Sequence, residues 1–270
     1  MKQSFYALLI LAGVILLSTA FSPAKKKWKS LLNGKDLSGW EVFVGPKEKD
    51  GEPLGLNNDP LNLFSVIEYE GEKVLRISGE INASIATKEE FENYQLVMEF
   101  KWGKKVYSKL NSGLLYHSYG DYGAGLGVWM SSHELQLWTG HIGDSYRMGK
   151  TYCEIPSIKI SEDKYVYNKT GENTKSVPKT RSVIVAKDED YEKQKGAWNR
   201  IELYCYGRTS VHVVNGKVNM INYKSGKYLD DGTIEPLTKG KIQLQSEGGE
   251  LFIRNIEIRS IDQIPPKLLK

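Results

Sequence analysis

Three polar side chains alternate with two leucines in the segment Glu134-Leu135-Gln136-Leu137-Trp138. Successive side chains of a strand point to opposite faces, so we expect the leucines in the core and the other three residues together on the opposite face. An acid, an amide and an indole in one row are typical of a sugar subsite, where a ring stacks on the indole and hydroxyl groups bond to the polar atoms. A solvated outer face is the alternative interpretation.

Further groups for proton transfer lie close in the sequence. His117 shares a strand face with Asn111 and Gly113 if alternation holds, and the missing side chain at Gly113 leaves room for a ligand. Histidine titrates near neutrality, which suits acid–base chemistry, although His117 could also be a rim residue. His141 and Asp144 lie in a glycine-rich loop directly after the first segment, and they fit catalytic, metal-binding or turn roles equally well.

The spacing of acids argues against ordinary glycoside hydrolysis by one strand. Retaining glycosidases hold two carboxyl groups about 5–5.5 Å apart, and jelly-roll glucanases place them at alternate positions of a strand. Here the position after Glu134 is Gln136, which can neither attack nor release a proton. Asp144 remains a possible partner from the next loop, so an ordinary glycosidase using Glu134 and Asp144 stays open.

Arg254 falls between Phe252 and Ile256 on one face of an apolar strand. An arginine among hydrophobic residues requires a carboxylate or a ligand. We expect it either to contact substrate or to brace Glu134.

The sequence predicts no metal and no nucleotide cofactor. It contains no H-x-H, H-E-x-x-H or calcium-loop pattern, and no glycine-rich phosphate loop before a helix. A single divalent cation held by His141, Asp144 and Glu134 is the alternative.

Period-two alternation along most of the chain predicts an all-β fold. The Asn215-Gly216 pair between two alternating runs predicts a hairpin. Short strands separated by glycine-rich turns indicate a sandwich or barrel, taken here as one domain over residues 31–262. Residues 161–196 are polar and interrupt the pattern; we interpret them as an insertion, either a lid or a solvated excursion. The predicted strands cover residues 63–68, 73–78, 94–102, 111–117, 126–130, 133–138, 197–206, 211–214, 218–223, 241–245 and 250–259.

The first 20 residues have the layout of a secretory signal peptide. Lys2 precedes an apolar run from Phe5 to Leu17, and Ser18-Thr19-Ala20 offers a cleavage site after Ala20. An uncleaved anchor is the alternative, but the run falls short of the ~20 residues of a spanning helix. We therefore expect a secreted or periplasmic protein with no membrane span after cleavage, beginning with a basic tether over residues 21–30.

Composition narrows the partners. The net charge of +4 is modest, and no basic stripe is interleaved with aromatic residues, so a nucleic-acid partner is not expected. Six Trp and 16 Tyr suit a surface that stacks on sugar rings.

Export would permit a disulfide between Cys153 and Cys205, but alternation places Cys205 on a buried strand face, which favours free thiols.

Several short motifs, in matching order over residues 28–259, resemble the bacterial 3-keto-disaccharide (3-keto-glucoside) hydrolase domain family. Each motif is weak alone, and their order and spacing make the set specific. They are Trp28 with Leu31-Leu32-Asn33-Gly34-Lys35-Asp36-Leu37-Ser38-Gly39-Trp40, Asn111-Ser112-Gly113-Leu114-Leu115-Tyr116-His117, Glu134-Leu135-Gln136-Leu137, Gly143-Asp144, Gly196-Ala197-Trp198-Asn199, Val214-Asn215-Gly216, Gly240-Lys241-Ile242-Gln243-Leu244-Gln245 and Phe252-Ile253-Arg254-Asn255-Ile256.

The resemblance implies a concanavalin A-like jelly-roll sandwich of two antiparallel sheets, with a cleft on the concave face. It also implies cleavage of 3-keto-glycosides by deprotonation at C2, elimination and hydration, after a separate sugar-3-oxidising enzyme has made the ketone. Proton transfer would fall to Glu134, His117 and His141, with the first two as the leading pair. Substrate binding would fall to Asn111, Gln136, Trp138, Asp144, Arg254 and Asn255. A non-catalytic carbohydrate-binding module is the main rival.

Overall fold

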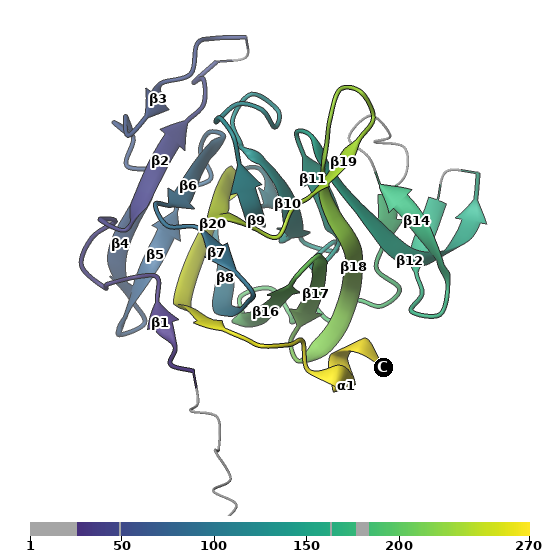
Figure 1. The fold of residues 1–270 in the computed structure, drawn as a ribbon. Coiled ribbons are helices and arrows are strands. Elements are labelled where there is room, and N and C mark those ends of the chain that lie inside the picture. Colours follow the sequence, from purple (N-terminus) through teal and green to yellow (C-terminus); the bar gives the residue numbers. More distant parts are fainter. Residues whose placement is uncertain (1–25, 49, 163, 177–183) are drawn as a thin grey trace, which may run out of the picture.

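The computed structural model describes residues 26–48, 50–162, 164–176 and 184–270, and nearly all of its regular structure is β-strand (Figure 1). The expected signal peptide and residues 21–25 of the tether therefore lie outside the described residues. Within the described ranges, no helix is long and apolar enough to cross a membrane.

Two antiparallel layers form the body of the protein, and the long strand β20 (Lys239–Ser260) belongs to both. The first layer has the order β4 (Phe64–Tyr69), β5 (Glu72–Ile77), the second half of β20, β8 (Tyr94–Asn111), β16 (Asn199–Tyr206), β17 (Thr209–Val214) and β18 (Lys217–Tyr228), with β1 (Lys29–Ser30) paired to the end of β20. The second layer has the order β3 (Gly55–Leu56), β2 (Trp40–Val44), β6 (Ala83–Thr87), the first half of β20, β9 (Gly113–Tyr119), β10 (Ser131–Gln136) and β11 (Ser145–Met148), with β7 (Phe91–Glu92) paired to the start of β20.

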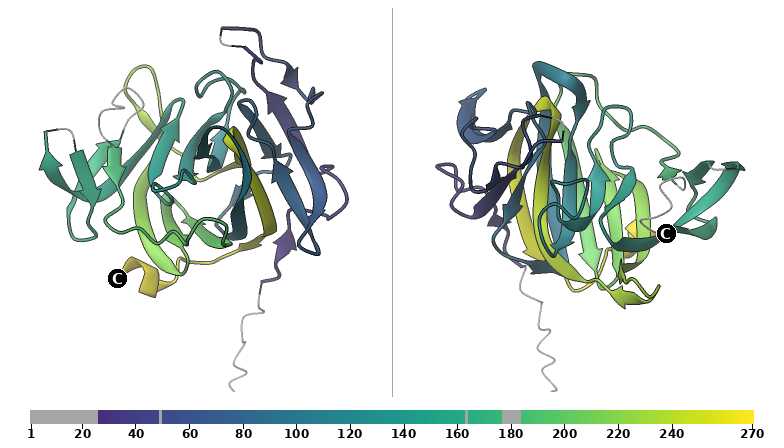
Figure 2. Two further views of the ribbon diagram at one scale, coloured as in Figure 1. Left: turned by 180° about the vertical axis from the view of Figure 1, so that it is seen from behind. Right: turned by 90° about the horizontal axis from the view of Figure 1, so that it is seen from above.

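A smaller sheet projects from one side of the body, away from β2 and β3 (Figures 1 and 2). It contains the strands of the predicted insertion and is joined to the first layer through the second half of β18. Its strands are β12 (Thr151–Ser161), β13 (Lys164–Tyr167), β14 (Glu172–Ser176), β15 (Ile184–Ala186) and β19 (Ile234–Pro236), and a one-turn helix α1 (Pro266–Leu269) follows β20 near the C-terminus.

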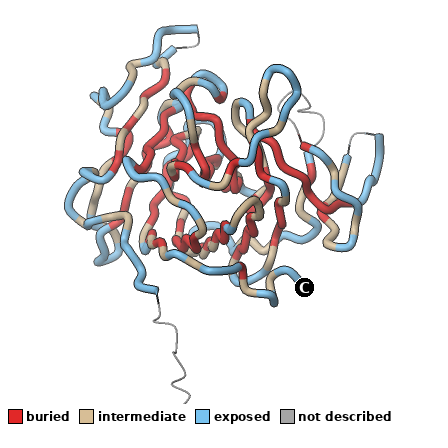
Figure 3. Tube along the Cα trace, viewed as in Figure 1, coloured by how far each residue is buried: buried red, intermediate tan, exposed pale blue. Residues whose placement is uncertain are grey.

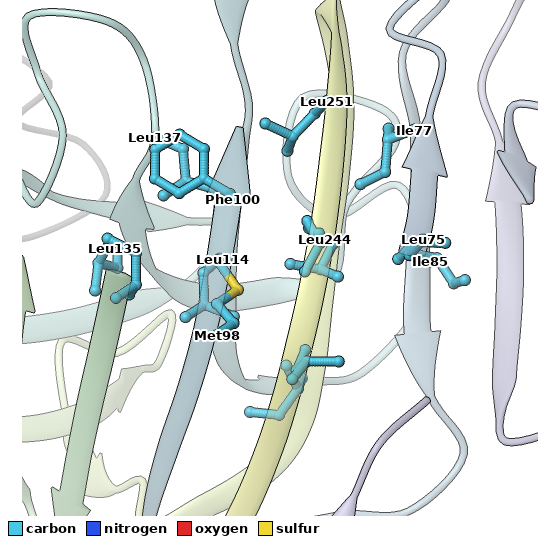
Figure 4. Packing of buried hydrophobic residues seen from close by; sticks show 14 of the residues in the cluster. Leu75, Ile77, Ile85, Met98, Phe100, Leu114, Leu135, Leu137, Leu244 and Leu251 are labelled. Carbon is cyan, nitrogen blue, oxygen red and sulfur yellow. The ribbon is translucent and has the colours of Figure 1, made fainter. Parts of the chain in front are cut away.

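The hydrophobic core lies between the two layers. Alternate residues of each strand point into it, and buried residues follow the strands while exposed ones gather in the loops (Figure 3). Figure 4 shows Met98, Phe100 and Leu251 of the first layer packed against Leu114 and Leu244 of the second. Burying a side chain of this size contributes about 1.5–3 kcal/mol relative to leaving it in water. The all-β jelly-roll sandwich expected from the sequence is confirmed.

The Asn215-Gly216 hairpin is also confirmed, since β17 and β18 pair across it and both turn residues have positive φ. The predicted strand over residues 126–130 is wrong. That segment is a turn-rich loop in which Leu126 has a φ of 51°, a value that strands do not adopt. The pattern did not reveal β6, which is buried on both faces and so does not alternate, or β12, whose Pro156 argues against a strand.

Both cysteines are free and buried, as the sequence favoured. Burial raises the pKa of the Cys205 thiol to about 12, so it behaves as a small apolar group.

Histidines line the polar end of the interior. His117, His133 and His212 are all fully buried and surround Tyr116, whose hydroxyl lies 3.0 Å from Nε2 of His212. Burial lowers the pKa of His117 to about 3 and that of His212 to about 4. These side chains are neutral in the folded protein at physiological pH.

We predict that His117→Leu makes the protein less sensitive to acid. The unfolded chain takes up a proton on this histidine below about pH 6.5, whereas the folded chain does so only near pH 3. Stability is therefore lost as pH falls from 6.5, by about 1.4 kcal/mol per pH unit for one such group. Neither ring nitrogen of His117 has a hydrogen-bond partner among the described residues, so leucine leaves no partner unsatisfied.

Urea unfolding at pH 7, 5.5 and 4.5 measures this effect as the difference in unfolding free energy between variant and wild type. The difference should move in the variant's favour as the pH falls. Parallel pH profiles for the two proteins would contradict the assignment.

Candidate functional site

The outer face of the second layer, opposite the core, carries a cluster of polar side chains on neighbouring strands. Strand registers place Gln136 beside Gly113 and Leu244 beside Leu114, so Gln245 falls next to Gly113 in the same row. One row further along the sheet, Glu247 pairs with Asn111. Leu135 and Leu137 point into the core, as the alternation predicted.

Gly113 lies beneath the two central side chains of the cluster. A Cβ at residue 113 would lie 2.3 Å from Oε1 of Glu134 and 2.3 Å from Oε1 of Gln245. The two side chains therefore lean toward each other over the glycine. The space above Gly113, which we expected to be left for a ligand, is filled by these two side chains.

Several polar atoms of the cluster are buried without partners. Both carboxylate oxygens of Glu134, both amide atoms of Gln245 and Oδ1 of Asn111 have no hydrogen-bond partner among the described residues. Glu134 is 1% exposed and Gln245 is fully buried. Buried polar groups are normally satisfied, because an unmade hydrogen bond costs about 1–3 kcal/mol. Three such residues on one face indicate a site that binds something polar.

Charge around Glu134 is unevenly balanced. Burial raises the pKa of its carboxyl group well above the usual range, and the negative charge of Glu247 raises it further, while Arg147 and Lys109 oppose both effects. Burial also raises the pKa of Glu247, but Lys109 and a hydrogen bond from Asn111 act against that rise. The site thus holds two carboxyl groups that influence each other.

Tyr146 on β11 pairs with Glu134 across the strands. Burial raises the pKa of its phenol to about 12, with Asp144 and Glu134 adding to the rise. A neutral hydroxyl therefore flanks the carboxyl group.

Gln136 and Trp138 lie on the predicted face but already have local partners. Oε1 of Gln136 accepts hydrogen bonds of 2.9 Å from the backbone N–H groups of Leu137 and Trp138, which shapes the end of β10. The indole ring of Trp138 stacks on His141 at 4.2 Å, and Nζ of Lys109 lies 4.5 Å from the ring centre.

The loop after β10 holds His141 and Asp144 together at the edge of the cluster. Nδ1 of His141 lies 3.1 Å from Oδ2 of Asp144, while Oδ1 of Asp144 accepts the backbone N–H of Lys187 at 2.9 Å. The N–H of Gly140 donates to Glu192 at 2.8 Å. These bonds attach residues 187–192 of the predicted insertion to the loop. Burial raises the pKa of Asp144.

Across the part of the chain that the structure describes, no three His, Cys, Asp or Glu side chains converge in an arrangement that could hold a metal ion. Glu134, His141 and Asp144 therefore do not form a ready-made cation site there.

The predicted pairing of His117 with Glu134 is wrong. His117 has a φ of 50° and is the extra residue of a β-bulge where the registers of β9 shift, so alternation from Asn111 breaks before it. Its ring turns inward, 5.8 Å from Tyr94 and 5.5 Å from Tyr116. The second layer itself separates this ring, which lies in the core, from the polar cluster on the outer face. His117 therefore cannot reach a ligand there.

Arg254 and Asn255 are also far from the cluster, contrary to expectation. Arg254 bonds to Glu99 at 2.8 Å and to Glu72 at 3.0 Å on the outer face of the first layer, on the other side of the core. Asn255, with a φ of 51°, forms a bulge that returns Ile256 to the core, so Arg254 does not share a face with it. Arg254 stacks over Trp198 and neither contacts nor braces Glu134.

Gln245, Glu247, Lys109 and Tyr146 were missed by sequence reasoning. A signal for two of them exists: Gln243, Gln245 and Glu247 alternate with residues of the opposite face, as the polar residues around Glu134 do. That this strand lies beside β9 depends on a pairing between segments more than 100 residues apart.

A cavity of about 430 Å³ lies between the loop that follows β2 and residues 126–128. Ile81 and Asn82 are among its lining residues, and the backbone oxygen of Ile81 accepts a hydrogen bond from Ser246. Its other walls come from Pro46, Lys47, Glu48, Gly51 and Pro53 and from residues 126–128. Its lining residues do not include Glu134, Gln245 or Glu247, so it is separate from the polar cluster.

The chain matches the sequence model of one protein family. The sequence model of a family described as a 3-keto-alpha-glucoside-1,2-lyase-like domain matches residues 27–259. No curated protein matches the chain.

The chain is similar to several solved structures at low values of identity and TM-score. Two proteins from Parabacteroides distasonis, designated candidate glycosyl hydrolases, are 23% and 18% identical over 87% of this chain and cover 100% and 94% of their own, each with a TM-score of 0.49. The carbohydrate-binding module CBM66 from Bacillus subtilis is 8% identical over 73% of this chain and 92% of its own, with a TM-score of 0.43. These values are too low to transfer an activity.

We predict that Glu134→Gln stabilises the folded protein at neutral and alkaline pH. Because the pKa of Glu134 is raised on folding, the unfolded chain releases its proton above about pH 4.3 while the folded chain keeps it. Wild type therefore loses stability as pH rises from that value, and an uncharged glutamine does not. Melting temperatures from pH 4.5 to 8.5 should show a widening advantage for the variant.

Glu99→Gln is the matched control, because its carboxylate is paired with Arg254 on the other layer. It should give no such gain. A Glu134→Gln variant that is less stable than wild type at pH 8 would show that the carboxylate is stabilised in the folded state.

Proposed function

Because the chain belongs to the family of 3-keto-alpha-glucoside-1,2-lyase-like domains, we propose that it cleaves 3-keto-glycosides on the outer face of the second layer, with Glu134 transferring a proton. The observation that carries the proposal is the carboxyl group of Glu134, buried with neither oxygen partnered among the described residues. A perturbed ionisable group of this kind is characteristic of catalytic sites.

A ketone at C3 changes what the protein must do. It acidifies the hydrogen on C2, so a base can remove that proton and generate an enolate. The C1 substituent then leaves by β-elimination, and water adds to complete hydrolysis. The reaction needs a base near C2, a proton donor for the leaving oxygen and hydrogen-bond donors for the enolate oxygen.

The residues of the cluster meet these needs. Glu134 and Glu247 are the two carboxyl groups available for proton transfer, and both have a raised pKa. The amide of Gln245 has a free N–H₂ group beside Glu134 to donate to an enolate oxygen. His141, next to Trp138 at the edge, remains a candidate for proton transfer at the rim.

We also propose that the protein works outside the cytoplasm, after cleavage behind Ala20, on substrate delivered by a sugar-3-oxidising enzyme. This part rests on the sequence of residues 1–20 and on the ketone that the proposed chemistry requires.

We predict that the purified protein releases the alcohol from a 3-keto-glucoside with an alkyl or sugar aglycone but not from the same glucoside unoxidised at C3. Release is measured by chromatography of the free aglycone. Glu134→Gln should lower kcat/KM on the oxidised substrate by about 100-fold to 10,000-fold, the usual contribution of one general acid or base.

The Glu99→Gln variant serves as the control for handling and folding. Cleavage of the unoxidised glucoside would indicate an ordinary glycosidase instead. A sugar-dependent rise in melting temperature with no bond broken would indicate a carbohydrate-binding module. Full activity of Glu134→Gln would remove this residue from the mechanism.

We further predict that activity does not depend on a divalent cation. Two carboxyl groups and the amide of Gln245 supply the proton transfers and the hydrogen bonds that the proposed reaction needs. Dialysis against EDTA, followed by assay with and without added Mg²⁺, Mn²⁺, Ca²⁺ or Zn²⁺, should leave kcat/KM within about two-fold. A loss of activity that a single added cation restores would show instead that the reaction requires a metal ion.

A further inference from the structure

The two carboxyl groups of the cluster lie in different surroundings. Glu134 is buried, and its oxygens accept no hydrogen bond from the described residues. Glu247 is half-buried, receives a hydrogen bond from Asn111 and lies close to the ammonium group of Lys109. An apolar, unbonded environment favours the neutral acid, whereas hydrogen bonds and a nearby cation favour the carboxylate.

Strand geometry brings both groups to one ligand. Glu247 follows Gln245 by two residues, so both side chains point to the same face of β20. Gln245 meets Glu134 over Gly113, and Glu247 pairs with Asn111 in the next row. Along the sheet, Glu134 and Glu247 therefore lie on opposite sides of Gln245.

Building on the proposed function, we infer that Glu247 is the base that removes the C2 proton and that Glu134 is the acid that protonates the leaving oxygen. In other enzymes, environments that separate the pKa values of two neighbouring carboxyl groups distinguish the acid from the base. The pKa of Glu134, raised well above its usual range by burial, agrees with the acid role.

Protons and electrons balance over the cycle. The Glu247 carboxylate takes the proton from C2, and the C2–H electron pair moves into the enolate of the C3 ketone. The enolate collapses to form the C1–C2 double bond, the C1–O bond breaks, and the leaving oxygen takes its electron pair and the proton of Glu134. Glu134, now a carboxylate, takes a proton from the water that adds to C1, and Glu247 returns its proton to C2.

Lys109 is assigned as a positioning and charge-balancing residue. Its ammonium group lies over the Trp138 ring and lowers the pKa of both Glu134 and Glu247. It offsets the negative charge that the pair carries when Glu247 is ionised.

Two probes separate the roles. The first is the 3-keto derivative of 1-deoxyglucose, which has no leaving group at C1 and so reports C2 proton removal alone, as deuterium uptake from D₂O followed by NMR. The second is a pair of 3-keto-glucosides with 4-nitrophenyl and methyl aglycones, because 4-nitrophenolate leaves without protonation and methoxide does not.

Glu134→Gln should keep deuterium uptake at C2 and release of 4-nitrophenolate within about ten-fold of wild type, while losing about 100-fold or more on the methyl glucoside. Glu247→Gln should lose about 100-fold or more in uptake and in release of both aglycones. Glu99→Gln is the control variant, and circular dichroism and melting temperature verify folding.

The opposite pattern, with uptake lost in Glu134→Gln and retained in Glu247→Gln, would overturn the assignment. So would a Glu247→Gln variant that is as active as wild type in every assay. If wild type itself neither exchanges C2 nor releases either aglycone, the proposed function fails, and that result differs from either outcome for the variants.

Discussion

The site depends on the pleat of the second-layer strands, which turn one face to the core and the other to the polar cluster. A strand that buries leucines on one face must present its alternate residues on the other. β10 and β20 both bury leucines against the first layer, and both are hydrogen-bonded to β9 in fixed register. Glu134 and Gln245 therefore meet over Gly113 because the core fixes where their neighbours lie. A one-residue slip of either strand would turn the polar residues into the core.

A carboxyl group held this way opposes folding rather than assisting it. Burial of Glu134 without a partner disfavours the charged form, and the fold tolerates it because the main core buries many side chains worth about 1.5–3 kcal/mol each. The contrast with Glu99 is informative, since that carboxylate is paired with Arg254 on the other layer. Among the described residues, the other buried acids Asp144, Glu154 and Glu250 have partners. The unpartnered Glu134 is therefore retained at a cost in stability, which a functional role would explain.

Sequence alternation predicted what lies on regular strands and failed where the strands are irregular. It placed Leu135 in the core and Glu134 opposite, and it found the Asn215-Gly216 hairpin. It misplaced His117 and Asn255 because each is a bulge residue with positive φ, which a count of two cannot anticipate. Glu247 escaped for a different reason. Its strand carries the right pattern, but only the long-range pairing with the 94–111 strand brings it beside Asn111. Local pattern thus identifies candidates, and non-local register decides which of them meet.

The two acids that could accompany Glu134, namely Asp144 and Glu247, differ in the hydrogen bonds that they make. Asp144 follows it in the sequence, yet one oxygen accepts the N–H of Lys187 and the other contacts His141. Acting as nucleophile or base, it would have to release the bonds that attach residues 187–192 to the loop. Among the described residues, Glu247 makes no hydrogen bond to the insertion, and its half-buried carboxyl group faces the same side as Gln245. We therefore propose that the distant acid exchanges the proton, while the bonds of the nearer one attach the insertion to the loop.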